Sequence, residues 1–206
     1  MKYIALTALA AAIGMTSHAN AANFVEGKDY AVLENPDTIS GDTIIVREFF
    51  WYGCIHCYNL EPYMQKWADN KPDDVAFFQT PAALNPVWET SARGFYTAQL
   101  MGYQGKTHHK LFNAVIKDEK RNLAGTNKGA LVDWYAAQGL DKEKFEGLFN
   151  SFAVNTKIAR SNDAAMRYGM SGTPSVVVQG KYMVLGEGEK VPQVVNYLVD
   201  KVRAEK

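Results

Sequence analysis

The only two cysteines of this chain lie three residues apart, in the segment Cys54-Ile55-His56-Cys57. Cysteines at positions i and i+3 of a helix lie about 5 to 6 Å apart, which is a separation at which a disulfide can form. The pair can therefore change between dithiol and disulfide without moving the backbone. This spacing predicts a reversible two-electron redox site.

Three other interpretations of the cysteine pair are weaker. A structural disulfide that closes so short a loop constrains the unfolded chain little. A zinc site needs about four ligands, and beyond the cysteines the exported chain has only three histidines, His56, His108 and His109. A c-type haem needs a histidine directly after the second cysteine, where this chain has Tyr58. The sequence favours a redox pair, and we expect no metal and no cofactor.

The flanking residues predict the elements that hold the pair. Residues 43–50 are rich in β-branched and aromatic side chains and predict a strand, whereas apolar residues recur every three to four positions in 58–67 and predict a helix. The cysteines therefore open a helix directly after a strand. Free backbone N–H groups and the helix dipole stabilise a thiolate there, so we expect the pKa of Cys54 to fall below about 8.5, the value of a free thiol. Cys54 is the predicted nucleophile.

The first residues predict the compartment. Lys2 supplies a positive charge, residues 4–15 are apolar and small apart from one threonine, and residues 19–21 match an A-x-A cleavage site. Residues 1–21 are therefore predicted to be a signal peptide, with Ala22 as the first residue of the exported chain. An exported C-x-x-C pair meets oxidising surroundings, which favours an oxidase over a reductase.

Charge and composition set bounds on partners. The full chain has 22 basic and 22 acidic residues, and the predicted signal peptide removes only Lys2 from this balance. A near-neutral chain without a basic stripe gives no reason to expect nucleic acid or an anionic membrane surface as partner.

The rest of the pattern predicts an α/β domain interrupted by helices. Residues 86–161 show successive helical periodicities. Strands resume at 174–178 and 182–184, which predict a hairpin, and a final helix begins near Pro192. We expect a first α/β part at 22–85, a helical domain at 86–161 and a second α/β part at 162–206. The last two helices before the hairpin are predicted to carry Phe145, Leu148, Phe149 and Phe152, and then Ile158, Ala165 and Met166.

These motifs occur in an order that resembles the DsbA family of periplasmic thiol:disulfide oxidoreductases. The order is a cleaved signal, a Glu-Phe-Phe strand leading into C-x-His-C, the helical block, and Gly-Thr-Pro before a valine-rich strand. The resemblance covers nearly the whole exported chain. It implies a thioredoxin-like fold, with a central mixed sheet flanked by helices and an inserted all-α domain. It also implies oxidation of newly exported cysteine-containing proteins in the periplasm, and reoxidation by a DsbB-type quinone-linked membrane oxidase. We expect a monomer.

The dipeptide between the cysteines departs from the Pro-His of the best-known members of the family. Here it is Ile55-His56, and Ile55 has an N–H group that proline lacks. His56 keeps the position at which an imidazole can interact with the Cys54 thiolate, so we still expect strong oxidising character. The alternative is that His56 is only a polar residue at the start of a helix.

Glu48 is an acid on an otherwise apolar strand. By strand alternation it shares a face with Ile44, Val46 and Phe50. Burial would raise its pKa and let it relay a proton for Cys57, as the resemblance suggests. The alternative is a partly exposed acid or a structural ion pair.

Thr173 and Pro174 precede the predicted valine-rich strand. Sequence alone predicts an ordinary trans bond and a strand start. The resemblance implies a cis bond and places this loop against the C-x-x-C, where its backbone can pair with an extended substrate. Met170 then either helps to shape the substrate groove or packs in the core.

The predicted function is the introduction of disulfide bonds by exchange through Cys54 and Cys57. Two alternatives use the same fold: an exported reductase or isomerase, and a non-catalytic peptide-binding chaperone that does not use the thiols.

Overall fold

The structure is a computed structural model that describes residues 24–206. The predicted signal peptide, residues 1–21, and Ala22 lie outside the described residues, and the cleavage site stays a prediction. Within the described part of the chain, no helix is both long enough and apolar enough to cross a membrane.

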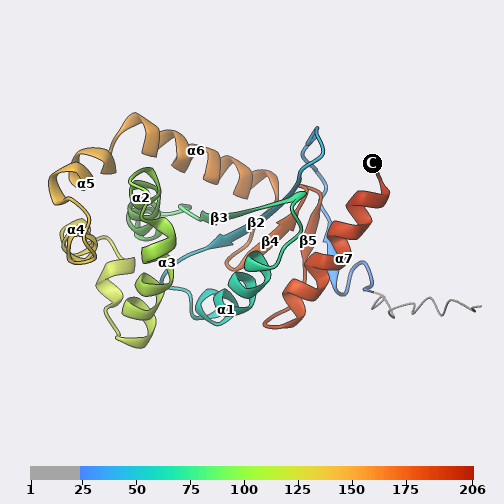
Figure 1. The fold of residues 1–206 in the computed structure, drawn as a ribbon, viewed down its shortest axis with the longest axis horizontal. Helices are drawn as coiled ribbons and strands as arrows, with labels where there is room; N and C mark the ends of the chain where they lie inside the picture. The colour runs from blue at the N-terminus through green and yellow to red at the C-terminus, as the bar shows by residue number, and fades with distance from the viewer. Residues whose placement is uncertain (1–23) are drawn as a thin grey trace, which may run out of the picture.

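Five strands form one mixed sheet in the spatial order β1-β5-β4-β2-β3 (Figure 1). β2 pairs in parallel with β3 and antiparallel with β4, and Glu48 on β2 lies opposite Val176 on β4. The sheet therefore joins the segment before the cysteines to the segment after the helical block. The strands are β1 (Tyr30–Val32), β2 (Ile44–Phe50), β3 (Val75–Pro81), β4 (Ser175–Val178) and β5 (Tyr182–Val184).

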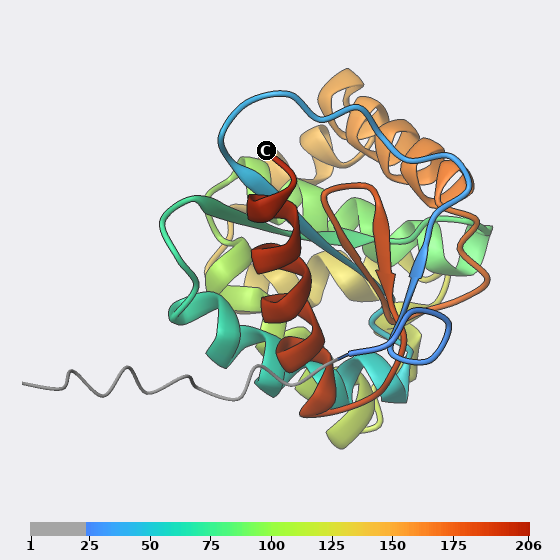
Figure 2. The same ribbon diagram turned by 90° about the vertical axis from the view of Figure 1, so that its right-hand side faces the viewer.

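Helices cover both faces of the sheet (Figures 1 and 2). Ile44 and Val46 point to the face covered by α1 (Ile55–Asp69) and α7 (Lys190–Ala204). Phe49, one strand position out of phase with them, packs with Val177 against the C-terminal half of α6 (Phe152–Arg167). Because successive strand residues point to opposite faces, β2 is buried on both sides.

The remaining helices form a second core at one end of the sheet (Figure 1). Phe50, Tyr52 and Cys57 pack into this core, so the cysteine pair lies where the sheet meets the helical block. The elements of this block are α2 (Pro86–Leu100), α3 (Gln104–Phe112), a π-helical turn (Asn113–Lys117), a 3-10 turn (Arg121–Ala124), α4 (Lys128–Ala137) and α5 (Lys142–Phe149).

The hairpin turn and the C-terminus are fixed by specific contacts. Gln179 and Gly180 take positive φ angles of 53° and 59° in the three-residue connection between β4 and β5, where the Lys181 N–H donates to the Val178 carbonyl oxygen at 3.0 Å. Positive φ at both central residues is typical of a type I′ turn. A Cβ atom at Gly180 would lie 2.6 Å from the Cβ of Asp37, so only glycine fits there. At the end of the chain, the Lys206 Nζ donates to the carbonyl oxygens of Gly41 and Asp42, at 2.8 and 2.7 Å.

The predicted mixed sheet with a helical insertion is confirmed, and some details differ. The short strand β1 was not predicted. Phe152 begins α6 rather than ending α5 and is 86% exposed, and Met166 is 66% exposed on the same helix. The proposed boundary between 161 and 162 lies inside α6, whose first part packs on the helical core and whose last part packs on the sheet. The final helix begins at Lys190, slightly before the predicted Pro192.

Candidate active site

The cysteines lie at the transition from β2 to α1. Cys54 is the N-cap residue of α1, with an extended backbone (φ −90°, ψ 114°), and Cys57 is in the first turn. The Cys54 N–H donates to the Trp51 carbonyl oxygen at 3.0 Å, which closes the turn between the two elements. A Cβ atom at Gly53 would lie 2.3 Å from the Trp51 indole, so the turn also needs glycine.

The two sulfur atoms have different surroundings. The two cysteines are not joined by a disulfide here; Cys54 is half-buried and Cys57 is completely buried. The Cys57 backbone N–H donates to the Cys54 Sγ at 3.3 Å, as expected for the side chain of a helix N-cap. The Cys54 thiol donates in turn to the carbonyl oxygen of Thr173 at 3.2 Å.

These surroundings move the pKa values of the two thiols in opposite directions. A hydrogen bond from the Cys57 thiol is the largest effect on Cys54, and with the backbone N–H groups of Cys57 and His56 it lowers the Cys54 pKa to about 6. Burial is the largest effect on Cys57, and its pKa is raised far above the ordinary range. At neutral pH the outer sulfur is therefore mostly thiolate and the inner sulfur stays a thiol.

A groove of about 660 Å³ lies beside the Cys54 side of α1. Thr173 and Pro174 line it, and the peptide bond between them is cis, as the family resemblance implied. Met170 is not among the lining residues, because it packs against the core around Phe49. The other lining residues are His56, Asn59, Leu60, Tyr63, Gly186, Glu187 and Gly188.

His56 lies at the mouth of this groove on the exposed side of α1. In the described part of the chain, the hydrogen bonds to the Cys54 sulfur do not include one from the His56 imidazole. The backbone of His56 does contribute, because its N–H is one of the groups that lower the Cys54 pKa.

Glu48 is buried, as strand alternation predicted, with 3% of its surface exposed. Its Oε2 has no hydrogen-bond partner among the described residues. Burial first, and the nearby Glu61 second, raise the pKa of Glu48 to about 8. Glu48 therefore holds a proton at neutral pH and ionises slightly above it.

Comparison with known proteins decides the family. Residues 45–198 match the model of the DSBA-like thioredoxin domain. The chain belongs to the DsbA family. It is 36% identical to the thiol:disulfide interchange protein DsbA of Pseudomonas aeruginosa over 205 residues, which are 97% of this chain and 95% of that protein. It is 39% identical to the protein of the same name from Pseudomonas syringae pv. tomato over 204 residues, 96% and 94% of the two chains.

Solved structures of the DsbA family have the same fold. A crystal structure of Pseudomonas aeruginosa DsbA matches with a TM-score of 0.81 and 35% identity, covering 88% of this chain and 96% of that one. The DsbA oxidoreductase of Xylella fastidiosa matches with a TM-score of 0.79 and 30% identity, covering 87% and 98%. The predicted family, the thioredoxin-like fold with its helical insertion and the thiol:disulfide oxidoreductase activity are confirmed.

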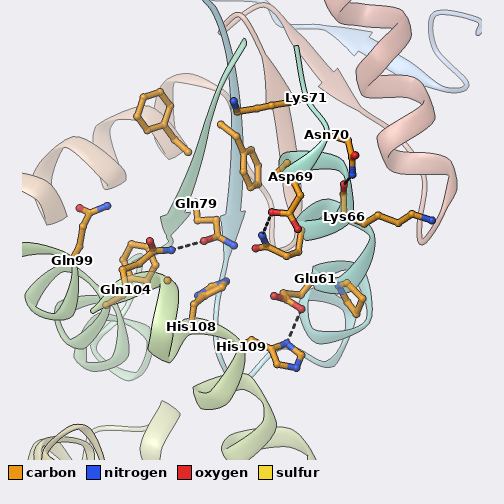
Figure 3. A pocket seen from close by; sticks show the side chains of 17 residues that line it. Glu61, Lys66, Asp69, Asn70, Lys71, Gln79, Gln99, Gln104, His108 and His109 are labelled. Carbon is orange, nitrogen blue, oxygen red and sulfur yellow. Dashed lines mark hydrogen bonds and ion pairs between the residues drawn. The ribbon is translucent and has the colours of Figure 1, made fainter. Parts of the chain in front are cut away.

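Sequence reasoning missed one acid of this DsbA-family site. Glu61 is 4% exposed on α1, and its Oε2 lies 2.9 Å from the Nδ1 of the exposed His109 on α3. Figure 3 shows Glu61 and His109 joined by a dashed line among the side chains that line a cavity of about 820 Å³. A signal for Glu61 was present, because it stands four residues after Cys57 and so continues the buried stripe of α1.

The neighbouring His108 is a core residue. It is 4% exposed, and its Nδ1 lies 2.9 Å from the hydroxyl of Tyr52, in the turn before the cysteines. Burial lowers the pKa of His108 to about 3, so the imidazole is neutral. Within residues 24–206 no three histidine, cysteine or acidic side chains are grouped as a metal site.

Proposed function

We propose that the chain oxidises pairs of cysteine thiols in exported proteins, and that Cys54 and Cys57 form its redox-active disulfide. One observation carries the proposal: in one helical turn the half-buried Cys54 sulfur accepts the Cys57 N–H at 3.3 Å, while Cys57 itself is completely buried. An accessible thiolate beside a buried thiol is the arrangement that thiol–disulfide exchange uses.

In the first step, a substrate thiolate attacks the Cys54 Sγ of the disulfide form. A bond forms between the substrate sulfur and Cys54, the Cys54–Cys57 bond breaks, and its electron pair goes to the Cys57 Sγ. Only Cys54 is accessible for this attack, because Cys57 is completely buried. The Cys57 sulfur then takes up a proton, since its raised pKa disfavours the thiolate.

We assign the supply of that proton to Glu48. With a pKa of about 8, Glu48 is protonated at neutral pH and can give up its proton without a large cost. Among the described residues the two side chains share no direct hydrogen bond, so the transfer that we propose passes through an intervening solvent molecule. Glu48 becomes a carboxylate in this transfer, so the negative charge passes from the Cys57 sulfur to Glu48 until Glu48 takes up a proton from solvent.

In the second step, another thiolate of the substrate attacks the substrate sulfur of the mixed disulfide. The oxidised substrate leaves, and Cys54 is released as a thiolate. Its pKa of about 6 makes it a good leaving group. Because the folded protein stabilises the reduced form in this way, its disulfide is a strong oxidant.

Substrate binding is assigned to the groove beside Thr173 and Pro174. An extended peptide there can form backbone hydrogen bonds with Thr173 while its cysteine lies against Cys54. His56 borders the groove, and its backbone N–H lowers the Cys54 pKa. We retain its imidazole as the side chain that stabilises negative charge on Cys54.

The compartment and the reoxidising partner belong to the same proposal. We place the enzyme in the periplasm, acting on newly exported cysteine-containing proteins as a monomer, with a DsbB-type quinone-linked membrane oxidase restoring the disulfide. The sequence that resembles a signal peptide and the DsbA-family membership support this assignment.

Trapping the mixed disulfide tests the mechanism. Cys57→Ser, with Cys54 first converted to its mixed disulfide with glutathione, should accumulate a covalent complex when a reduced substrate with a single cysteine displaces the glutathione, whereas Cys54→Ser treated in the same way should accumulate none. Equilibration of the wild-type pair with glutathione then measures the oxidising strength. A potential as low as about −270 mV, the value of thioredoxin, would contradict an oxidase and favour a reductase.

A further inference from the structure

A second cleft, of about 750 Å³, lies between α6, β3 and the end of α2. Figure 1 shows α6 passing over the sheet on the side of β3. The residues to which the exchange reaction is assigned, namely both cysteines, His56, Glu48, Thr173 and Pro174, do not line this cleft, although it shares Phe78, Gln79 and Gln99 with the cavity of Figure 3. Any function of the cleft is therefore separate from thiol–disulfide exchange at Cys54.

Four cationic side chains line the cleft, in a chain whose basic and acidic residues are equal in number. Arg47 is half-buried on β2, and within residues 24–206 it forms no ion pair. It donates to the Thr80 hydroxyl at 2.9 Å and lies 5.4 Å from the centre of the Phe78 ring. These neutral partners leave its charge uncompensated and most of its five donors available.

Two more cations of the cleft also form no ion pair among the described residues. Lys157 donates to the Gln99 side chain at 3.0 Å and lies 5.6 Å from the centre of the Tyr96 ring. Arg160 is exposed and forms no ion pair among the described residues.

Two acids face these cations. Asp37 accepts hydrogen bonds from Arg167, the fourth cation, and from the hydroxyl of Tyr168. Arg167 therefore already compensates the negative charge of Asp37. Asp163 is exposed on α6. Four cations against two carboxylates leave the cleft with an excess of positive charge, which attracts anions.

The cleft also has an apolar side. Phe78 and Leu100, both lining residues, are 44% and 41% exposed. Tyr96 also lines the cleft, and burial raises its pKa to about 12, so its hydroxyl stays neutral and able to donate. Cations and exposed apolar side chains in one cleft suit a ligand that has both a carboxylate and an apolar body.

We propose that this cleft binds a small organic anion, in which a carboxylate contacts Arg47, Lys157 and Arg160 and an apolar group lies against Phe78 and Leu100. A free aryl or alkyl carboxylate and the C-terminal carboxylate of a peptide ending in an aromatic residue share this chemistry. An Arg–carboxylate contact can form two parallel hydrogen bonds, which orients such a ligand.

The experiment is a titration of the ¹⁵N-labelled protein followed by NMR. The probes are 3-phenylpropionate and an acetylated peptide with a free C-terminal phenylalanine, with the amide of each probe as the uncharged control. Shifts confined to β3 and α6 with either acid at concentrations up to about 10 mM, and absent with the amides, support the proposal. Absence of binding by both acids, or equal binding of acids and amides, overturns it.

Variants locate the site. Arg160→Gln, at an exposed position, should weaken binding about tenfold, and Arg47→Gln by at least as much, since each removes a charge-assisted hydrogen bond. The matched control is Arg121→Gln, an exposed arginine outside the cleft, which should bind as the wild type does. Both cleft variants should retain thiol–disulfide exchange activity. Unchanged binding in folded Arg160→Gln and Arg47→Gln would overturn the assignment.

Discussion

The two cysteines at the start of α1 differ in pKa because only Cys54 reaches solvent. Cys54 gains N–H donors at the helix start, whereas the helix buries Cys57 against the helical core. The pair could be predicted from spacing and from the strand-to-helix transition. The residues that cover Cys57 could not be predicted, because they include side chains of α2 and α3, which follow much later in the sequence.

The first prediction concerns the reactivity of the two thiols. In the reduced protein, iodoacetamide should modify Cys54 and leave Cys57 unmodified. With a pKa of about 6, the thiolate fraction of Cys54, and with it the rate, should rise about tenfold between pH 5 and pH 7. Mass spectrometry of quenched samples checks both statements. Equal modification of the two cysteines would contradict the assignment.

The second prediction concerns the cost of burying Glu48. Its pKa is raised from 4.5 to about 8 on folding. Below pH 4.5 Glu48 is protonated in both the folded and the unfolded protein, so its burial does not reduce the free energy of unfolding. As the pH rises from 4.5 toward 8, Glu48 ionises only in the unfolded protein, and the free energy of unfolding falls. Glu48→Gln removes this loss. The difference in unfolding free energy, in favour of the variant, should grow by roughly 5 kcal/mol between pH 4 and pH 9.

Urea melts at a series of pH values measure this difference. The exposed Glu34→Gln is the matched control and should show no such growth. A variant that gains nothing at pH 9 would mean that Glu48 is ionised and compensated in the fold. Substrate oxidation by Glu48→Gln should also be slower than by the wild type if Glu48 supplies the proton to Cys57.

At the scale of the elements, α1 acts through its first turn. The Cys54 sulfur accepts a hydrogen bond from the Cys57 N–H, and the His56 N–H also lowers the Cys54 pKa. The backbone contribution remains in any variant that keeps the helix, and the contribution of a side chain can therefore be measured separately.

The third prediction uses this separation for His56. His56→Leu removes an imidazole at the exposed start of α1, so the Cys54 pKa should rise above about 6 and the disulfide should become less oxidising. A rise of one pKa unit corresponds to about 30 mV for a two-electron couple. Thiolate absorbance and glutathione equilibration measure the two quantities. Asn59→Leu, which borders the same groove one turn later, is the control and should change neither.

The elements with strong local signals were predicted well. Asn127 and Asp141 cap α4 and α5 with their side chains, as residue types favoured at helix starts should. The three-residue β1 escaped prediction because its pairing with β5 is formed by residues about 150 positions later, without a local periodicity. The Thr173–Pro174 cis bond was likewise available only through the family resemblance, because a lone X-Pro bond is usually trans.

At the scale of the whole molecule, the redox state and stability are linked. The Cys54 pKa is lowered from 9.0 to about 6 in the folded reduced protein. A lowered pKa adds stability that is fully present above pH 9 and is lost as the pH falls through 6. The disulfide form has no such group.

The fourth prediction follows from this linkage. The stability of the reduced form, relative to the oxidised form, should increase as the pH rises from 6 to 9. The contribution at pH 7 is on the order of 1 kcal/mol, and solvent screening reduces it because Cys54 is only half-buried. Urea melts of both forms at pH 6, 7.5 and 9 check the trend. A relative stability that does not change with pH would contradict a Cys54 pKa near 6.

The contact between Lys206 and the residues before β2 has a practical consequence. It holds the C-terminus at the entry to β2, whereas Cys54 follows the exit of the same strand. Seven strand residues span about 23 Å, so the two lie at opposite ends of this strand. A tag, a fused partner or a solid support attached after Lys206 would leave the thiols facing solution. The enzyme should thus be suited to immobilisation through its C-terminus as a recoverable oxidant for refolding other proteins.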